Sequence, residues 1–396
     1  MTPAERLLLA CAGGQESRFF ATDGVGWAEF LDLADRHGLR ALAHRALGGG
    51  ATPLLPAAAA RSLWMASVER QRCNAILSRE LARVASALDD RDIACIPFKG
   101  PTLSLLAYGD ASLREFGDLD VLVRSRDVEA AQHALEALGY RPEYPIPDHA
   151  RHALLHAHKH YDIVLRGAAG NLVELHWRTD ADFPVEQPHE SWWESRPRVM
   201  LEGHAMRSFT ASELMLVLLI HGSKHHWASL HWLADIAGLT TREPIDWTWI
   251  LERAGQLRCR HRVALGTRLA RDLLGAAVPP MPCEDDPRIG RLAAELAEEM
   301  FAPEAEPGAS KLLARNLALF DTGRQRARHV VDVVFAPTFA DWTRWRLPAA
   351  LAFLYFPLRL ARLSVKYASV AIRSLRPRSR IGATLRTPPP RPHSRG

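Results

Sequence analysis

Cysteine is scarce in this chain, and the few cysteines do not form a recognisable framework. The five of them are widely spaced, and no two form a CxxC pair. An odd number of isolated cysteines argues against both a disulfide scaffold and a zinc ribbon. Such usage fits a reducing compartment, so we expect a cytoplasmic protein.

Long uncharged runs are also missing. The best candidate, residues 347–358, is only twelve residues long, whereas a helix that spans a bilayer needs about 20. The N-terminus lacks a basic segment followed by a long apolar stretch, so no signal peptide is expected. We therefore expect no integral membrane span.

Acidic residues are absent from the C-terminal end. None follows Asp341, whereas twelve of the 50 lysines and arginines lie between 344 and 395. The rest of the chain therefore has 38 basic against 45 acidic residues, which is a net charge of −7. Residues 376–396, rich in arginine, proline and serine, are expected to be disordered. The composition leaves open whether this basic tail contacts an anionic surface, such as nucleic acid or a membrane, or is only solvated.

The spacing of apolar residues divides the chain into five regions. Two apolar segments of short length, 93–98 and 118–123, predict strands, and 161–165 with 172–176 predict a hairpin. The remaining segments show helical spacing, which favours an α+β fold with a small mixed sheet between helical regions. We expect a helical N-terminal region (1–90), a core that contains the predicted strands (91–205), a helical bundle that completes a cleft (206–277), C-terminal helices (288–375) and the tail (376–396).

Two carboxylates lie one residue apart on the predicted strand 118–123. Residues i and i+2 of a strand point to the same face, so Asp118 and Asp120 project together while Leu119 and Val121 face a core. Two adjacent like charges are costly to bury without a cation. Mg²⁺ is a hard ion that binds carboxylates together with substrate phosphates. The pattern therefore points to phosphoryl or nucleotidyl transfer.

Further polar residues cluster around this pair in the predicted sheet. Glu174 lies inside the apolar strand 172–176 and is a third candidate carboxylate, with His176 following it on the same face. Lys99 and Gly100 end the first strand, where glycine lets the backbone approach a phosphate and lysine adds a positive charge. Arg114 offers a planar fork that matches phosphate, or a structural partner for Glu115 or Asp118.

These segments together resemble a known family. KGPTLSLLAYGDASLREFGDLDVLV, VELHW and LLIHGSKHHWASLHWLADIAGL, within residues 60–270, are similar to the uncharacterised nucleotidyltransferase family of the polymerase-β-like superfamily. The resemblance implies metal binding by Asp118, Asp120 and Glu174. In place of the superfamily's Gly-Ser turn, this chain has Lys99-Gly100, which is usual for this branch. Genes of family members lie beside peptide-modification gene clusters, including those for lasso peptides, and the resemblance therefore suggests a small-molecule or peptide acceptor.

The expected function is nucleotidyl transfer dependent on Mg²⁺ or Mn²⁺, from a nucleoside triphosphate to an unknown acceptor, with release of pyrophosphate. Asp118, Asp120 and Glu174 are the expected catalytic and metal-binding residues, and Lys99, Gly100, Arg114 and His176 the expected nucleotide-binding residues. Two alternatives remain. One is a catalytically degenerate protein of the same fold that binds a nucleotide or a partner protein in a biosynthetic cluster. The other is a membrane-surface or nucleic-acid-binding protein that uses the basic tail.

Two other patterns have more than one interpretation. His221 and His225 are four residues apart and share a helix face, a spacing that zinc can use. No glutamate of an HExxH motif lies between them, so we expect them to pack at a helix seam or to line the substrate cleft. Residues 347–373 mix Leu, Phe and Tyr with basic residues, which fits a helix packed on the body or one lying on a membrane surface.

Overall fold

The computed structural model describes residues 1–15, 22–48, 55–144, 160–302, 307–335 and 347–364, together with residues 338, 341, 344 and 345. These residues belong to two compact units, Met1–Val330 and Val331–Gly396. Within the described ranges, no helix is long and apolar enough to cross a bilayer. The predicted tail, residues 376–396, lies outside the described residues.

The first unit begins with helices, as the apolar spacing predicts. A capping box starts the first of them, because the Thr2 hydroxyl accepts from the backbone N–H of Glu5 while the Glu5 carboxylate accepts from the backbone N–H of Thr2. The fourth helix is 33 residues long. The four are α1 (Pro3–Ala12), α2 (Trp27–Arg36), α3 (Arg40–Gly48) and α4 (Ala57–Asp89).

A mixed sheet follows, and it confirms the predicted α+β class. Its strands are β1 (Cys95–Pro97), β2 (Asp118–Val123), β3 (Arg141–Pro142), β4 (Asp162–Arg166) and β5 (Leu172–His176), in the order β1-β2-β5-β4-β3. β2 and β5 run parallel, and the other pairs are antiparallel. The first strand is shorter than predicted because the Ile93 N–H bonds back to the Leu88 carbonyl at the end of α4.

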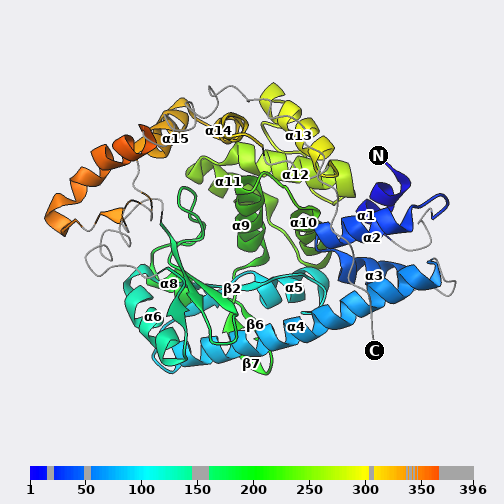
Figure 1. Ribbon diagram of the computed structural model, residues 1–396, viewed down its shortest axis with the longest axis horizontal. Coiled ribbons are helices and arrows are strands. Elements are labelled where there is room, and N and C mark those ends of the chain that lie inside the picture. Colours follow the sequence, from blue (N-terminus) through cyan, green and yellow to red (C-terminus); the bar gives the residue numbers. More distant parts are fainter. Residues whose placement is uncertain are drawn as a thin grey trace, which may run out of the picture. The chain divides into compact units, whose positions relative to one another are not determined.

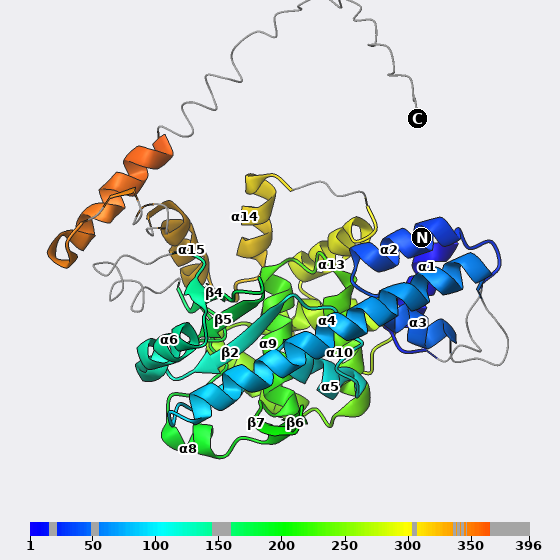
Figure 2. The same cartoon turned by 60° about the horizontal axis from the view of Figure 1, so that its bottom comes forward.

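Helices connect and cover these strands. The helix α5 (Gly100–Tyr108) links β1 to β2, and α6 (Val128–Ala137) follows β2 after the short 3₁₀ helix η2 (Ser125–Asp127). The long α4 contacts α6, α5 and β1 and runs along one side of the sheet, as Figures 1 and 2 show. Strands β4 and β5 form the predicted hairpin.

A second, smaller hairpin was not anticipated from the sequence. It consists of β6 (Arg198–Leu201) and β7 (His204–Arg207), which follow the short helix α8 (Glu190–Glu194). Glu202 and Gly203 form its turn, both with positive φ (50° and 77°). A two-residue turn of this kind that ends in glycine is a hairpin signal that sequence inspection could have used.

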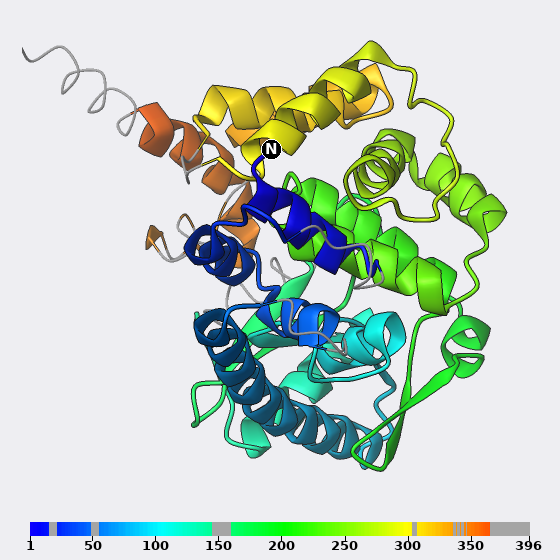
Figure 3. The same ribbon diagram turned by 90° about the vertical axis from the view of Figure 1, so that its right-hand side faces the viewer.

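Four helices then form the other wall of the unit, within the segment 206–277 that was predicted to be helical: α9 (Ala211–Lys224), α10 (Leu230–Arg242), α11 (Trp247–Leu257) and α12 (Arg260–Leu274). Figure 3 shows α9, α10 and α12 gathered on the side of the sheet away from α4. Helix α10 packs closely on α5. A Cβ at Gly238 would lie only 2.7 Å from the Ala107 carbonyl oxygen, so the absence of a side chain at Gly238 allows this close approach. The apolar faces of these helices share one core with the N-terminal helices.

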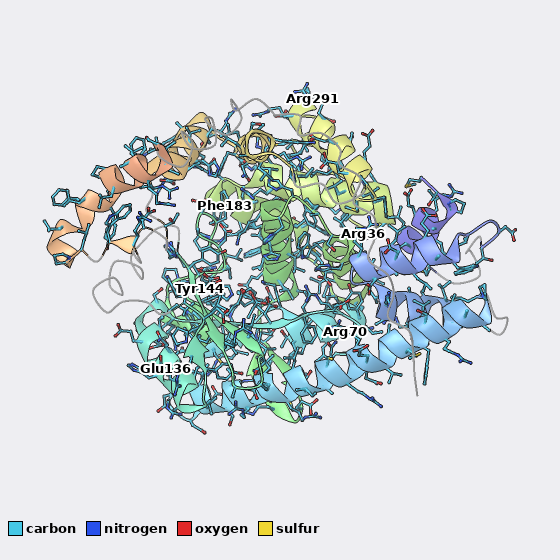
Figure 4. The ribbon with its side chains drawn as sticks, in the orientation of Figure 1. Arg36, Arg70, Glu136, Tyr144, Phe183 and Arg291 are labelled. Atoms are coloured by element: carbon cyan, nitrogen blue, oxygen red, sulfur yellow. The ribbon has the colours of Figure 1, made fainter. Side chains whose placement is uncertain are left out.

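Side chains fill the space between these layers (Figure 4). Phe183, labelled there, lies in the segment after β5, and the guanidinium of Arg262 on α12 stands 4.9 Å from its ring centroid. Further elements of the described chain are α13 (Pro287–Glu299), α14 (Ala309–Ala318), α15 (Gly323–Phe335) and the 3₁₀ helix η3 (Ala349–Leu354), which continues into helical residues 355–364.

The second unit has its own ion-pair cluster. Asp341, the last acidic residue of the chain, is fully buried and accepts hydrogen bonds from Arg359 at 3.2 Å and from Arg362 at 2.5 Å. Two of the basic residues of segment 347–373 are thus paired inside this unit. Phe353 and Phe356 are exposed (62% and 47%).

Candidate functional site

The register of the two parallel strands brings the predicted carboxylates together. Asp120 pairs with Glu174, and Leu122 pairs with His176. Side chains alternate across a strand, so Asp118, Asp120, Glu174 and His176 all project from one face of the sheet. The opposite face carries Leu119 and Val121, which are fully buried in the core.

Asp120 is the most heavily contacted of these side chains. Its Oδ1 lies 2.6 Å from Lys99 Nζ and 3.1 Å from His176 Nε2, and the same His176 nitrogen lies 3.3 Å from Glu174 Oε2. Its second oxygen, Oδ2, is buried and has no hydrogen-bond partner among the described residues. Donor atoms of Asp120, Glu174 and His176 lie within 4.8 Å of one another. Asp118 is outside that group but lines the same cavity.

The charges of this cluster shift the pKa values of its side chains. Burial alone would raise the pKa of Asp120, but Lys99 and His176 outweigh burial and hold that pKa well below its usual range. Burial and the neighbouring Asp120 charge raise the pKa of Asp118. Burial opposes protonation of His176, yet its hydrogen bonds to Asp120 and Glu174 raise its pKa to about 9. In this arrangement two cations face three carboxylates, which leaves one negative charge in excess.

Gly100 forms the turn between Lys99 and the rest of α5. Its φ is +52°, in the left-handed region where a side chain is strained, and its Cβ position would lie 3.5 Å from the Asp118 carbonyl oxygen. The turn therefore holds Lys99 against the carboxylate strand. Gly100 itself is buried beside the cavity, so its predicted contact with a phosphate stays a prediction.

Arg114 has a partner that the sequence did not indicate. Its Nε lies 3.1 and 2.9 Å from the two carboxylate oxygens of Asp235 on α10, which also accepts from the Tyr108 hydroxyl at 2.8 Å. The structural alternatives considered from the sequence were Glu115 and Asp118, and the ion pair is with neither. Arg114 also lines the cavity. Its predicted role at a phosphate stays a prediction.

Several residues of the site were missed by sequence reasoning. Asp162 is the register partner of His176, so it adds a further carboxylate to the same region. Tyr161 stacks on His176 with ring centroids 5.9 Å apart, and Lys224 on α9 hydrogen-bonds to the Tyr161 hydroxyl. The hairpin pairing could have indicated Asp162 from its position on the strand. Lys224 comes from a distant helix, and nothing in the sequence places it there.

A cavity of about 410 Å³ joins the two walls. The sheet contributes Lys99 and the acidic residues, and α9 and α10 contribute His221, His225, His231 and Trp232. His221 and His225 therefore line the cleft, which is one of the two positions expected from the sequence. A volume of this size falls within the range of small-molecule sites.

Comparisons with known proteins identify the family of this chain. Residues 23–275, more than half of the chain, match the family described as uncharacterised nucleotidyltransferase. The chain belongs to this family, which confirms the resemblance found in the sequence. No curated protein shows a significant match to the chain.

The chain is also similar to the solution structure of the antibiotic-resistance factor ANT(2'')-Ia. That match has 15% sequence identity and a TM-score of 0.32. It covers 49% of this chain and 94% of the other.

Proposed function

We propose that this protein is a nucleotidyltransferase that depends on Mg²⁺ or Mn²⁺ and moves a nucleoside monophosphate from a nucleoside triphosphate to a small-molecule, peptide or protein acceptor. The observation that carries the proposal is the set of three carboxylates, Asp118, Asp120 and Glu174, on one sheet face inside a single cavity. Family membership supports the reaction class. The acceptor is unknown.

The donor set fits a divalent cation. Within the part of the chain that the structure describes, Asp120 Oδ2 is buried and lacks a hydrogen-bond partner, and a buried oxygen of this kind is costly unless a cation or a donor reaches it. Carboxylate oxygens are the ligands that Mg²⁺ and Mn²⁺ prefer. Asp118, Asp120 and Glu174 would hold the ion, with His176 positioned beside Glu174. A bound cation would lower the pKa of the attacking oxygen and neutralise the triphosphate.

The side chains then divide the reaction between them. Lys99 provides a positive charge for the triphosphate, and Arg114 lies on the same cavity with its Nε fixed by Asp235. An acceptor oxygen forms a bond to the α-phosphorus, the bond from that phosphorus to the bridging oxygen breaks, and pyrophosphate leaves. Glu174, whose side chain is 25% exposed, accepts the proton of the acceptor.

A second candidate function is nucleotide or partner binding without catalysis. It is favoured by the ion pair of Lys99 with Asp120 at 2.6 Å and by the contact of Asp120 with His176, which neutralise the deepest carboxylate without a metal. That protein would bind a nucleotide with no requirement for Mg²⁺. The tail-driven membrane or nucleic-acid role rests on residues 376–396, which lie outside the described residues.

The first experiment is thermal unfolding with ATP, GTP, CTP or UTP, with and without Mg²⁺ or Mn²⁺. Binding to the native state raises the melting temperature, and no acceptor is needed. We expect a metal-dependent increase that Asp118→Asn and Asp120→Asn abolish and that the surface variant Asp272→Asn retains. An increase without metal that Asp120→Asn retains would favour the binding protein. No increase with any nucleotide would contradict nucleotidyl transfer and would favour the second candidate in its partner-binding form.

Activity is then followed by transfer of label from α-³²P-labelled triphosphates to acceptor pools. Loss of a residue that only supports a metal ligand costs about 10–100-fold. We therefore expect Asp120→Asn to reduce transfer by more than about 100-fold, because it replaces a ligand itself. Full transfer by Asp118→Asn and Asp120→Asn would contradict the proposal.

A further inference from the structure

The cavity has a second wall that the proposed chemistry does not use, and it is made of aromatic rings. His221 lies in the last turn of α9 and His225 caps the C-terminal end of that helix, whereas His231 and Trp232 lie at the start of α10. The Trp232 ring centroid is 5.3 Å from that of His225, 5.9 Å from His221 and 5.0 Å from His231. All four line the cavity. We refer to them as the ring wall.

The ring wall is uncharged at neutral pH. Loss of hydration and the cations Lys224 and Lys99 lower the pKa of His225 to about 4, and burial with Arg114 nearby lowers that of His231 to about 3. Burial and Lys99 lower the pKa of His221 well below its usual range, although Asp120 acts in the opposite direction. The sheet wall facing it is charged. One cavity therefore combines a charged side and a neutral aromatic side.

The two walls are close enough to contact one ligand. Lys224 on α9 lies 4.9 Å from the Tyr161 ring centroid, and Tyr161 stacks on His176 of the sheet cluster. Lys99, which pairs with Asp120, is close enough to lower the pKa of both His221 and His225. A molecule with an anionic end and a planar aromatic end matches this arrangement of side chains.

We propose that the ring wall binds the nucleobase of the triphosphate by stacking, while the phosphates lie against Lys99 and the carboxylate strand. This inference rests on the proposed function and adds the site of the base. Trp232 and His225 are inclined by only 32°, so they offer neighbouring faces to a planar heteroaromatic ring. Every base has a π-face, so stacking tolerates different bases. We therefore expect purine triphosphates to bind more tightly than pyrimidine triphosphates through their larger rings, with no strict choice of base.

The test compares ATP with inorganic tripolyphosphate, which lacks the adenosine and therefore the base, each with Mg²⁺ and followed by calorimetry. Loss of one stacking partner weakens binding of a base by roughly 5- to 150-fold. We expect Trp232→Ala to weaken ATP binding about 10-fold or more and to leave tripolyphosphate binding unchanged. Trp232→Phe should keep most of the affinity for ATP, because a ring remains at this position.

Two further variants separate stacking from a folding defect. Trp64→Ala removes a tryptophan that is 55% exposed on α4 and should change neither affinity. His225→Ala, at an exposed position, should weaken ATP binding in the same direction as Trp232→Ala but by less. Equal loss of ATP and tripolyphosphate in Trp232→Ala, or no loss of either, would overturn the inference. In that case wild-type binding of both probes through Asp120 would leave the proposed function intact.

Failure of the proposed function has a different signature. Wild-type protein would then bind neither probe, or would bind both without any effect of Asp120→Asn. Either result would also contradict the proposed base site. A ring wall that binds a planar acceptor would give a third result. Trp232→Ala would keep full affinity for ATP while the apparent KM for the acceptor in label transfer increased, and this too would overturn the base assignment.

Discussion

Two buried aspartates in the first unit, Asp120 on the sheet and Asp235 on α10, have opposite surroundings. Both oxygens of Asp235 bond to Arg114 and one also accepts from Tyr108, so its hydrogen bonding is satisfied. Asp120 has two cations on Oδ1, whereas no side chain or backbone group of the described residues bonds to Oδ2. The first arrangement is typical of a structural contact between helices. The second keeps one ligand position open, which is what a binding site requires.

Their pKa values shift in opposite directions because the balance between burial and nearby cations differs at the two residues. Burial raises the pKa of Asp235 more than Arg114 lowers it, so the net shift is upward. Around Asp120, Lys99 and His176 together outweigh burial, so the net shift is downward. Burial of a carboxylate therefore does not by itself indicate function. The number of cations that face it, and the oxygen that remains without a partner, separate the two cases.

The largest difference between the two aspartates should appear in stability. Asp235→Ala leaves Arg114 buried without a partner, and breaking a buried pair in this way costs about 3–5 kcal/mol. Asp120→Asn should cost less, because Lys99 keeps Asp118 and Glu174 as nearby charges. Chemical denaturation of both variants measures this difference. Equal destabilisation would mean that Asp120 is as structural as Asp235.

A smaller effect on stability distinguishes Gly238 on α10 from Gly100 beside the sheet. At Gly238 a Cβ would lie 2.7 Å from a backbone oxygen of α5, so Gly238→Ala should destabilise by about 1–3 kcal/mol through overpacking. At Gly100 there is space, but φ is +52°, so alanine costs about 1–2 kcal/mol in backbone strain. Asparagine tolerates the left-handed region. Gly100→Asn should therefore be milder than Gly100→Ala, whereas Gly238→Asn should be worse than Gly238→Ala, as melting temperatures would show.

An effect comparable in size to those at the glycines is expected on pH dependence and concerns His37, which accepts a hydrogen bond from the Leu230 N–H at the start of α10. Burial and the adjacent Arg36 lower its pKa to about 4 from 6.5. The unfolded chain thus binds more protons between these values, and the contribution of His37 to stability is present above pH 6.5 and is lost as the pH falls towards 4. The slope is at most about 1.4 kcal/mol per pH unit for one histidine.

Denaturation at pH 7, 6 and 5 checks this expectation. His37→Gln keeps an acceptor for the Leu230 N–H but cannot titrate, so its stability should fall less between pH 6.5 and 5 than that of the wild type. An unchanged slope in His37→Gln would show that other histidines cause the acid sensitivity. His225 and His231, whose pKa values are also lowered, are the next variants to compare.

Much of the fold followed from local patterns in the sequence. The strand Asp118–Val123 and the hairpin of β4 and β5 were predicted from runs of apolar and β-branched residues, and the α9–α12 helices from their helical spacing. The hairpin of β6 and β7 was missed, because its strands are short and partly exposed. The predicted five-region division stays a prediction. So do the cytoplasmic location and the basic tail.

The sequence by itself determined which side chains share the sheet face, because alternation along a strand is a local property that fixes Asp118 with Asp120 and Glu174 with His176. Tertiary structure alone decided their partners. Asp235 is 121 residues from Arg114 and Lys224 is 63 from Tyr161, and only the packing of α9 and α10 brings them together. The ring wall has the same origin. Helical spacing placed His221 and His225 on one side of a helix, and only the position of that helix over the sheet turned them towards the carboxylates.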